Sequence, residues 1–468
     1  MNFGNRQTHI TTISALLYYS LVFAQPAPIP ISVTIHGDSI IATRSDLFFG
    51  MNYWQWCPSW GDLVSGTESQ VKELRVKLLR FGGMQADLGY PDKLINGYLS
   101  KFYTYAKKIG AEPLLQVQIA RQKTTEERVA NALDMVRYFS TLCDLKYVSI
   151  GNEPDIYASN LASNAEYHAE HLDGYGIDQY CRDFNAVAAA IKKAYPAIKI
   201  IGLELSWNRD AWVPDFVKQC RDNIDLLSVH YYPFTAGQCT YDAVSSHYDE
   251  IADFYRTTRM LIDQNAPGKN IPLLIGETNI TWDGDPNRSN FDASPGTFAS
   301  ALWFADYMGI SSSQQDLFSI MPWGIREGWK LSFIASRRNP VFFVYKLFSE
   351  NTGKHCIHCE KVNDWVRVYA YKDDSKTASV LAVNWDTANS YSAGFRFSGM
   401  LNESTLSCTL PPFSLSAMTV SSDRRDTSLY LYTKALAMHG PVSNANPKFK
   451  AQFKIKNKKA GVRIKPLR

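Results

Sequence analysis

Residues Val148–Tyr157 read VSIGNEPDIY, an apolar run that ends at Gly151 and is followed by a carboxamide, a carboxylate and a proline. The run has the length and composition of a buried β-strand. The proline disfavours the α conformation at Glu153, so we expect this residue to stay extended at the strand end and not to begin a helix. A helix N-terminus or a plain turn would explain the same residues, and only the rest of the chain distinguishes these interpretations.

Runs of the same kind recur along the chain. Eight of them end in polar or glycine-containing segments: LFFGMNY (47–53), VKLLRFG (76–82), PLLQVQI (113–119), KYVSIGN (146–152), IKIIGLEL (198–205), LLSVHYY (226–232), IPLLIGE (271–277) and LFSIMPW (317–323). The segments between them are amphipathic with helical spacing, for instance residues 124–142 and 179–195. Near-continuous apolar strands that alternate with helices indicate a parallel sheet, and eight repeats predict a (β/α)8 TIM barrel over residues 47–352. A doubly wound open sheet is the competing topology, but no glycine-rich phosphate loop supports it.

The pattern changes after the barrel. Short alternating runs between residues 365 and 420 predict antiparallel strands and hence a C-terminal β-sandwich over residues 353–422. Residues 25–46 comprise a proline-rich spacer and a strand that we expect to join this sandwich. An apolar stretch before Gln25 indicates a secretory signal peptide at residues 1–24, so we expect a secreted or lumenal protein. A single N-terminal membrane anchor is the alternative.

The charge of the chain is uneven. Residues 440–468 carry nine Lys or Arg and no acidic residue, so the formal net charge of +4 conceals an acidic body. We interpret residues 423–468 as a solvated basic tail and predict no nucleic-acid binding, because no recognisable binding fold accompanies it. Weak electrostatic attachment to acidic glycans or a membrane surface is compatible with such a tail.

Eight cysteines in an exported chain favour some disulfides, whose pairing the spacing does not fix. The HCIHC stretch at residues 355–359 has ligand types found in zinc sites, but no second Cys/His pair lies at a suitable spacing. A local disulfide or free thiols are therefore expected there. We predict no metal and no cofactor.

In a parallel barrel the carboxyl ends of the strands open on one face, where barrel enzymes hold their active sites. The polar and aromatic residues at the eight predicted ends are Tyr53 with Trp54, Arg80, Gln118, Asn152 with Glu153, Glu204, His230 with Tyr232, Glu277, and Trp323. Glu153 and Glu277 stand three strands apart and can face each other across the mouth. Such a pair is what glycoside hydrolysis requires, one group as the acid and the other as the nucleophile or base.

Taken together, these motifs resemble clan A retaining glycoside hydrolases, and within that clan they look most like family 79, which contains heparanase and β-glucuronidases. The matching stretches are Arg80–Gly83, Gly151–Tyr157, His230–Pro233, Gly276–Asn279 and Thr297–Ala299. The resemblance implies a barrel followed by a β-sandwich, and a secreted retaining β-glycosidase acting on a polysaccharide or glycoconjugate through a covalent glycosyl-enzyme intermediate.

The resemblance also implies roles for individual residues. Glu153 would be the acid/base and Glu277 the nucleophile, Asn152 would bond the sugar 2-hydroxyl, and Arg80 would keep Glu277 ionised. Strand alternation places His230 and Tyr232 on one face, with Tyr231 in place of Tyr232 if a bulge intervenes. The remaining expected substrate contacts are the indoles of Trp54 and Trp323, which suit stacking on a sugar, although both are equally compatible with a core position.

The sugar and the mode of action stay open. The loop after the nucleophile strand reads NITWDGDPNRSN, with one glycine and two aspartates, where family 79 enzymes often bind a uronate with a glycine-rich loop. Arg288, Arg326 and Lys330 are candidates to compensate this negative charge. A clan A glycosidase of different sugar specificity and a non-catalytic glycan-binding protein on the same scaffold are the alternatives. Endo or exo action and the oligomeric state are not determined by the sequence.

Overall fold

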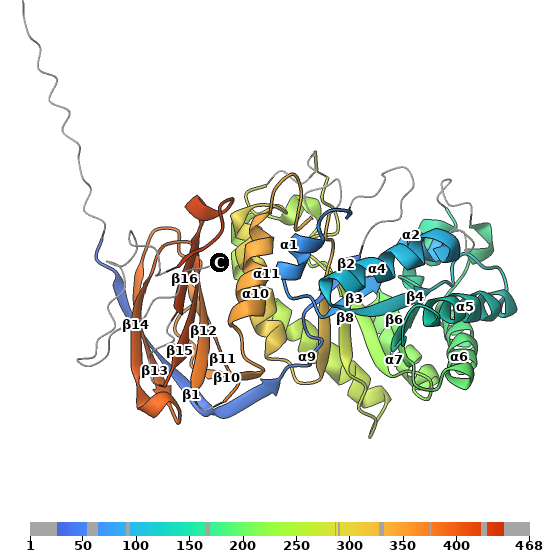
Figure 1. The fold of residues 1–468 in the computed structure, drawn as a ribbon, viewed down its shortest axis with the longest axis horizontal. Helices are drawn as coiled ribbons and strands as arrows, with labels where there is room; N and C mark the ends of the chain where they lie inside the picture. The colour runs from blue at the N-terminus through green and yellow to red at the C-terminus, as the bar shows by residue number, and fades with distance from the viewer. Residues whose placement is uncertain are drawn as a thin grey trace, which may run out of the picture.

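The computed structural model describes residues 26–53, 64–89, 94–163, 169–285, 287–288, 291–326, 332–374, 376–422 and 428–443. The predicted signal peptide, Trp54, Lys330 and most of the basic tail lie outside these residues. The described chain forms a barrel and a β-sheet domain that lie against each other (Figure 1).

The barrel is an eight-stranded parallel sheet in sequence order. Its strands are β2 (Gly50–Tyr53), β3 (Leu78–Phe81), β4 (Glu112–Val117), β5 (Tyr147–Ile150), β6 (Lys199–Leu205), β7 (Leu226–Tyr231), β8 (Leu273–Thr278) and β9 (Leu317–Pro322). A parallel bridge between Phe49 and Ile320 joins the first strand to the last and closes the ring. Each of the eight apolar runs coincides with one of these strands, six of which lie wholly inside their run while β4 and β8 extend one residue beyond it, so the predicted barrel is confirmed.

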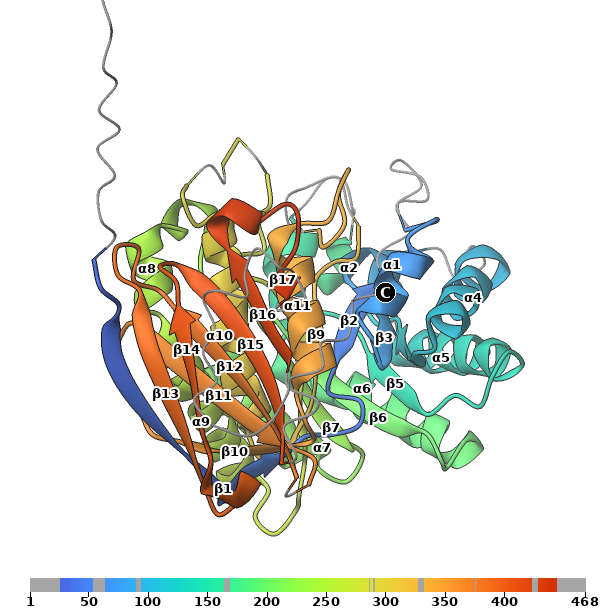
Figure 2. The ribbon, with the colours of Figure 1, turned by 60° about the vertical axis from the view of Figure 1, so that its left-hand side comes forward.

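Helices pack around the outside of the barrel (Figures 1 and 2). They are α1 (Glu68–Glu73), α2 (Met84–Leu88), α4 (Leu99–Ile109), α5 (Thr125–Ser140), α6 (Ile177–Ala194), α7 (Arg209–Cys220), α8 (Tyr241–Ser246), α9 (Tyr248–Asn265), α10 (Phe298–Ser312) and α11 (Pro340–Asn351). The start of α5 is fixed by a capping box between Thr124 and Glu127. No helix among the described residues is both long enough and apolar enough to cross a bilayer.

The second domain is a nine-stranded sheet with the order β14-β13-β1-β10-β11-β12-β15-β16-β17. Its strands are β1 (Ile29–Thr43), β10 (His355–Cys359), β11 (Val366–Lys372), β12 (Thr377–Asn384), β13 (Tyr391–Ser398), β14 (Thr405–Leu410), β15 (Ser414–Ser421), β16 (Ser428–Thr433) and β17 (Val442–Ser443). Figure 1 shows β13 and β14 in one layer and β12, β15 and β16 in the other. Cys408 of β14 contacts Met418 of β15 across the shared core, so the continuous sheet folds into the predicted sandwich.

Two details of this domain differ from the expectation. The sheet is mixed and not purely antiparallel, because β1 pairs in parallel with β13. It also continues past residue 422, where we expected the tail to begin, because β16 pairs with β15 and β17 pairs with β16. The short amphipathic run of β16 follows a polar connection, which conceals it in a sequence that turns basic soon afterwards.

The sandwich and the barrel share a continuous apolar core. Every residue of α10 is buried, and this helix lies between the barrel strands and the sheet (Figure 1). Asp306 of α10 accepts hydrogen bonds from Arg367, Tyr369 and Trp385 of the sheet domain. A buried carboxylate with three donors fixes the two domains relative to each other.

The cysteines correct a further expectation. The seven described cysteines are free thiols, including Cys356 and Cys359 of the HCIHC stretch. Cys356 and Cys359 lie on one strand, β10, and burial raises the pKa of both thiols. No disulfide is formed among the described residues, contrary to what the cysteine count favours.

Candidate active site

Glu153 and Glu277 come together at the carboxyl ends of the barrel strands. A carboxylate oxygen of each and a ring nitrogen of His230 all lie within 4.8 Å of one another. The Glu153 side chain is 18 % exposed and that of Glu277 is 8 % exposed, so both sit at the base of the barrel mouth. This separation is much closer to the roughly 5 to 5.5 Å of pairs in which one member attacks the sugar directly than to the roughly 6.5 to 9.5 Å of pairs that admit a water molecule.

The backbone at Glu153 is not extended as expected. Glu153 adopts a left-handed conformation with φ 52° and ψ 52°, and a short 3-10 helix begins at Pro154. The proline does exclude the right-handed helical conformation, but the Glu153 N–H donates to the carbonyl of Glu204 on the neighbouring strand at 2.7 Å. This bond turns the chain toward β6, and it is a tertiary contact that no local pattern reveals.

Arg80 is the centre of the site. Its guanidinium is buried and donates from Nη1 to Glu277 at 2.9 Å and to Asn52 at 2.8 Å, and from Nη2 to Asn152 at 2.7 Å and to Gln116 at 3.1 Å. Its Nε lies 3.2 Å from a Glu204 oxygen. The fixed fork of the guanidinium thus sets the orientation of side chains from five strand ends.

His230 connects the acidic side chains. Its Nδ1 lies 2.9 Å from Glu153 and its Nε2 lies 3.2 Å from Glu204. Burial works to lower the pKa of His230, but the Glu277 carboxylate and these two hydrogen bonds raise it to about 10. Burial likewise opposes the ionisation of Glu204, but Arg80 and His230 bring its pKa down to about 2. The imidazole is therefore a cation held among carboxylates.

The pKa of Glu153 is shifted in the opposite direction to that of Glu204. Burial raises the pKa of Glu153 above its ordinary value, against the opposing effect of His230. Glu277 has both oxygens engaged, one by Arg80 and the other by the Tyr232 hydroxyl at 2.9 Å. The Glu153 carboxyl group is thus biased toward its acid form, while Glu277 accepts the hydrogen bonds that suit a carboxylate.

Tyr232 takes the position expected from strand alternation. Its hydroxyl reaches Glu277, whereas Tyr231 points outward and packs against Phe254 and Tyr307. Trp323 is 7 % exposed and packs close to Gly83, where an added Cβ would lie 2.9 Å from the indole. Its backbone is fixed by hydrogen bonds with Thr278 and Asn279. The structure therefore brings together Glu153, Glu277, Asn152, Arg80, His230 and Tyr232, with Trp323 beside them.

Several residues of the site were not singled out from the sequence. Asn52 and Gln116 contact Arg80 directly, as does Glu204, which the strand-end pattern marked without giving it a role. Gln116 takes the place of Gln118, which donates instead to the carbonyls of Ala86 in α2 and of Gly89. Asp87 lies behind the site and accepts the N–H of Asn152 at 3.1 Å. The hydroxyl of Tyr157 donates to the same carboxylate. A buried asparagine and glutamine inside apolar runs were the available signal for two of these residues.

Gly276 shows how tightly the site is packed. A Cβ at this position would lie 2.0 Å from Glu204 Oε2 and 2.5 Å from Ser228 Oγ. The glycine beside the candidate nucleophile is therefore required by the buried carboxylate of Glu204, which reaches it from β6, two strands away.

We expect Gly276→Ala to lower the free energy of unfolding by about 2 kcal/mol or more, because Glu204 has no room to move without losing its partners. Denaturant titration measures this loss. Gly394→Ala in β13 is the matched control, since its Cβ would meet only the Ile31 carbonyl oxygen at 3.8 Å. Equal stability of the two variants would contradict the packing described for Gly276.

The cationic His230 predicts a pH-dependent stability. Its pKa is raised from 6.5 to about 10, so the stability it contributes is complete below pH 6.5 and is lost as the pH rises toward 10. The difference in Tm between the wild type and His230→Asn is expected to be largest near pH 6 and to shrink toward pH 10. Thermal melts across this range test the assignment, and a difference that does not change with pH would refute it.

Among the described residues, Glu153, His230 and Glu277 form the group whose ligand atoms lie close enough to hold a metal ion. The hydrogen-bond partners of Glu277 and the charge of His230 do not suit metal binding. Both Glu277 oxygens are occupied by Arg80 and Tyr232, and a protonated imidazole has no lone pair for a metal. The arrangement suits proton transfer and nucleophilic attack better than metal ligation.

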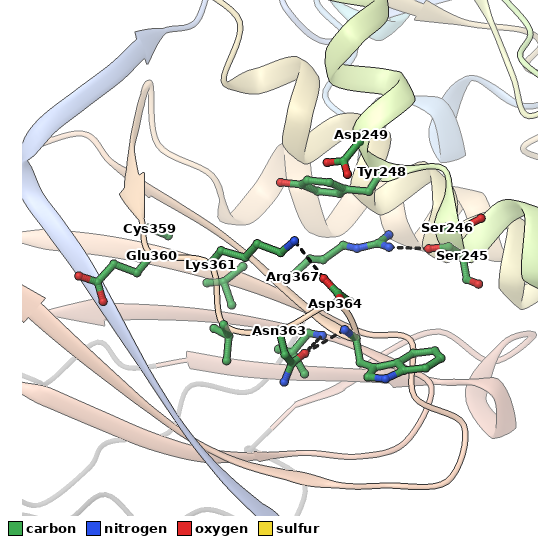
Figure 3. A pocket seen from close by; sticks show the side chains of 14 residues that line it. Ser245, Ser246, Tyr248, Asp249, Cys359, Glu360, Lys361, Asn363, Asp364 and Arg367 are labelled. Atoms are coloured by element: carbon green, nitrogen blue, oxygen red, sulfur yellow. Dashed lines mark hydrogen bonds and ion pairs between the residues drawn. The ribbon is translucent and has the colours of Figure 1, made fainter.

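A hollow separate from the candidate active site lies at the junction of the barrel and the sheet domain (Figure 3). It has a volume of about 490 Å³ and is lined by residues of α8, α9 and the segment 359–368. Lys361 pairs with Asp364 at 2.9 Å, and Arg367 donates to the Ser245 carbonyl. None of the candidate catalytic residues lines it, so this hollow is separate from the carboxylate pair.

Comparison with known proteins finds solved structures that share this fold. No protein-family model matches the chain, and no curated protein matches its sequence. Among solved structures, an α-L-arabinofuranosidase from Thermotoga maritima in complex with arabinose has a TM-score of 0.64 at 16% identity, covering 84% of this chain and 100% of that one. A family 51 α-L-arabinofuranosidase from Bifidobacterium longum has a TM-score of 0.65 at 15% identity, covering 84% and 99%.

A family 44 xyloglucanase from Paenibacillus polymyxa has a TM-score of 0.63 at 12% identity and covers 84% of this chain and 99% of its own. At such identities the likeness establishes the fold. The match extends over nearly the whole of each neighbour, so the chain shares with these glycoside hydrolases the combination of a TIM barrel and a β-sandwich.

Proposed function

We propose that the protein is a retaining glycoside hydrolase of the clan A type. The observation that carries the proposal is the pairing of Glu153 and Glu277, with oxygens within 4.8 Å and unequal partners, at the mouth of a TIM barrel. The fold shared with arabinofuranosidases and a xyloglucanase supports it.

In this mechanism Glu277 attacks the anomeric carbon while Glu153 donates its proton to the departing oxygen. A covalent glycosyl-enzyme forms, and Glu153 then removes a proton from the water that cleaves it. Arg80 and the Tyr232 hydroxyl hold Glu277 in position through its two oxygens. Asn152 has its carbonyl oxygen bonded to Arg80, which leaves its amide N–H₂ to donate to the sugar 2-hydroxyl.

The charges of the loop after β8 indicate whether the substrate sugar is neutral or negatively charged. Arg288 is paired with Asp283 at 3.0 Å and with Asp285 at 3.5 Å, so it is engaged inside its own loop. Asp283, Asp285 and Arg288 together leave one net negative charge, which repels a uronate. A neutral pyranoside or furanoside is therefore the favoured substrate class, and the β-glucuronide expected of family 79 is the less favoured one.

Hydrolysis of a panel of nitrophenyl glycosides tests the proposal. The panel includes the α-L-arabinofuranoside, β-xyloside, β-glucoside, β-galactoside and β-glucuronide, and NMR of the first-formed product shows whether the anomeric configuration is retained. Release from one sugar with retention supports the proposal. Inversion would remove the nucleophile role of Glu277, and preference for the glucuronide would refute the charge argument.

Secretion is a separate part of the proposal and rests on the sequence of residues 1–24 alone. Expression of the full chain with a C-terminal epitope tag, followed by analysis of the medium and the N-terminus, tests it. Cleavage after Ala24 and export would support the signal peptide.

A further inference from the structure

Two exposed tryptophans of the described residues lie on loops at the carboxyl ends of the barrel strands. Trp207 follows β6 and is 55 % exposed, and Trp282 follows β8 and is 45 % exposed. Their ring centroids are 6.5 Å apart and their planes meet at 78°. The two indoles form a corner of flat apolar surface that water covers in the free protein. Neither residue is used by the mechanism above.

The first indole stands on a rigid support next to the acid/base residue. The Asp155 carboxylate, two residues after Glu153, accepts hydrogen bonds from the N–H groups of Ser206, Trp207 and Asn208 at 3.1 to 3.2 Å and from the Ser206 hydroxyl at 2.8 Å. The loop that carries Trp207 is thus tied to the loop that carries Glu153. An exposed tryptophan on such a support is presented for contact at little entropic cost.

The second indole is supported from the other side. Thr281 is buried and forms a parallel bridge with Phe234, and its hydroxyl accepts the N–H of Asp283. Trp282 stands between these two anchored residues and is five positions beyond Glu277. The corner is therefore tied to the loops of both carboxylates.

A hollow of about 420 Å³ opens beside Trp207. Its lining includes Asn208, Arg209, Phe254 and His230 at the end of β7, and does not include Trp282, Glu153 or Glu277. His230 bonds to Glu153, which would donate a proton to the departing oxygen. The leaving group of a glycoside lies on the side of the acid/base residue, and the Trp207 loop is tied to that side through Asp155.

We propose that Trp207 and Trp282 form a binding subsite for a sugar residue on the leaving-group side of the cleaved bond. This inference rests on the proposed function. The apolar face of a sugar ring packs on an indole, and two indoles at a steep angle contact two sides of one ring or two successive rings. The natural substrate is therefore an oligosaccharide or polysaccharide and not a glycoside with a small leaving group.

The test compares two substrates that share the cleaved sugar, as identified by the glycoside panel. One is an oligosaccharide of that sugar, and the other is its glycosyl fluoride, whose leaving group is a single atom with no ring to stack. Trp207→Ala and Trp282→Ala are each expected to lower kcat/KM on the oligosaccharide about tenfold more than on the fluoride. Trp365→Ala is the matched control, because Trp365 is 46 % exposed on the sheet domain.

Equal losses on the two substrates, or no loss on the oligosaccharide, would overturn the subsite. A second readout does not depend on catalysis. Glu277→Gln and its double variant with Trp207→Ala are compared by affinity electrophoresis in gels that contain arabinan, xyloglucan or xylan. Retardation of the single variant that is lost in the double variant supports the subsite, and absence of retardation in all three gels overturns it. Failure to cleave any glycoside would instead count against the proposed function.

Discussion

Glu277→Gln is expected to abolish turnover, with a fall in kcat on the order of 10⁴-fold or more. An amide cannot form the glycosyl ester. Its oxygen can accept only one of the hydrogen bonds that Arg80 and Tyr232 donate to Glu277, because the NH₂ group that replaces the other oxygen is a donor. The side chain keeps its size, so the fold is expected to persist. Steady-state kinetics on the glycoside found by the panel measure the effect.

Glu153→Ala distinguishes the acid/base role of Glu153 from the nucleophile role of Glu277. Without the acid, a natural glycoside loses protonation of its leaving oxygen, and its cleavage is expected to fall on the order of 10²- to 10⁴-fold. A dinitrophenyl glycoside needs no proton to depart, so formation of the glycosyl-enzyme is expected to be nearly normal in a burst experiment. Glu360→Gln is the control, because Glu360 is exposed just after β10 in the sheet domain. If Glu277→Gln retained activity, or if Glu153→Ala affected both substrates equally, the assignments would be wrong.

The fold could be predicted because its strands are buried on both faces. Each barrel strand then reads as an apolar run, and the run stops where the chain reaches the mouth, so polar residues such as Glu153 and Glu277 mark the strand ends. Both the number and the order of the strands follow from this pattern. The limits of the sheet domain were less visible, because β16 and β17 are short and lie beside the basic tail.

Site residues could be predicted where they stand at a regular strand end. They could not be predicted where an irregular backbone conformation changes the direction of the side chain. Glu204 has φ 51°, and β6 and β7 shift register next to it, which turns a side chain of uncertain direction toward Arg80 and His230. A non-glycine residue takes this conformation only when tertiary contacts hold it, so the sequence gives no local sign. Gly276 was the indirect sign that another group packs closely against β8, because a glycine inside a strand often marks a close neighbour.

Arg80 supports a prediction about both stability and activity. Its guanidinium is fully buried and faces two carboxyl groups, Glu204 at 3.2 Å and Glu277 at 2.9 Å. Burial works to lower the pKa of Arg80, but these two carboxylates raise it above its ordinary value. Arg80→Met would leave the buried carboxylates with His230 as the cation between them, and the free energy of unfolding is expected to fall by about 3 to 5 kcal/mol.

Arg80→Lys keeps the charge but replaces a five-donor fork with three donors at one point, so it cannot serve Asn52, Gln116, Asn152 and Glu277 together. It is expected to recover part of the stability while activity stays low, because Asn152 and Glu277 lose their fixed orientation. Arg128→Met is the matched control, since Arg128 is also buried and pairs with Asp183 at 2.9 Å outside the carboxylate site. It is expected to lose stability but to keep kcat per folded molecule. Full activity in Arg80→Lys would show that Arg80 contributes charge alone and does not orient the site.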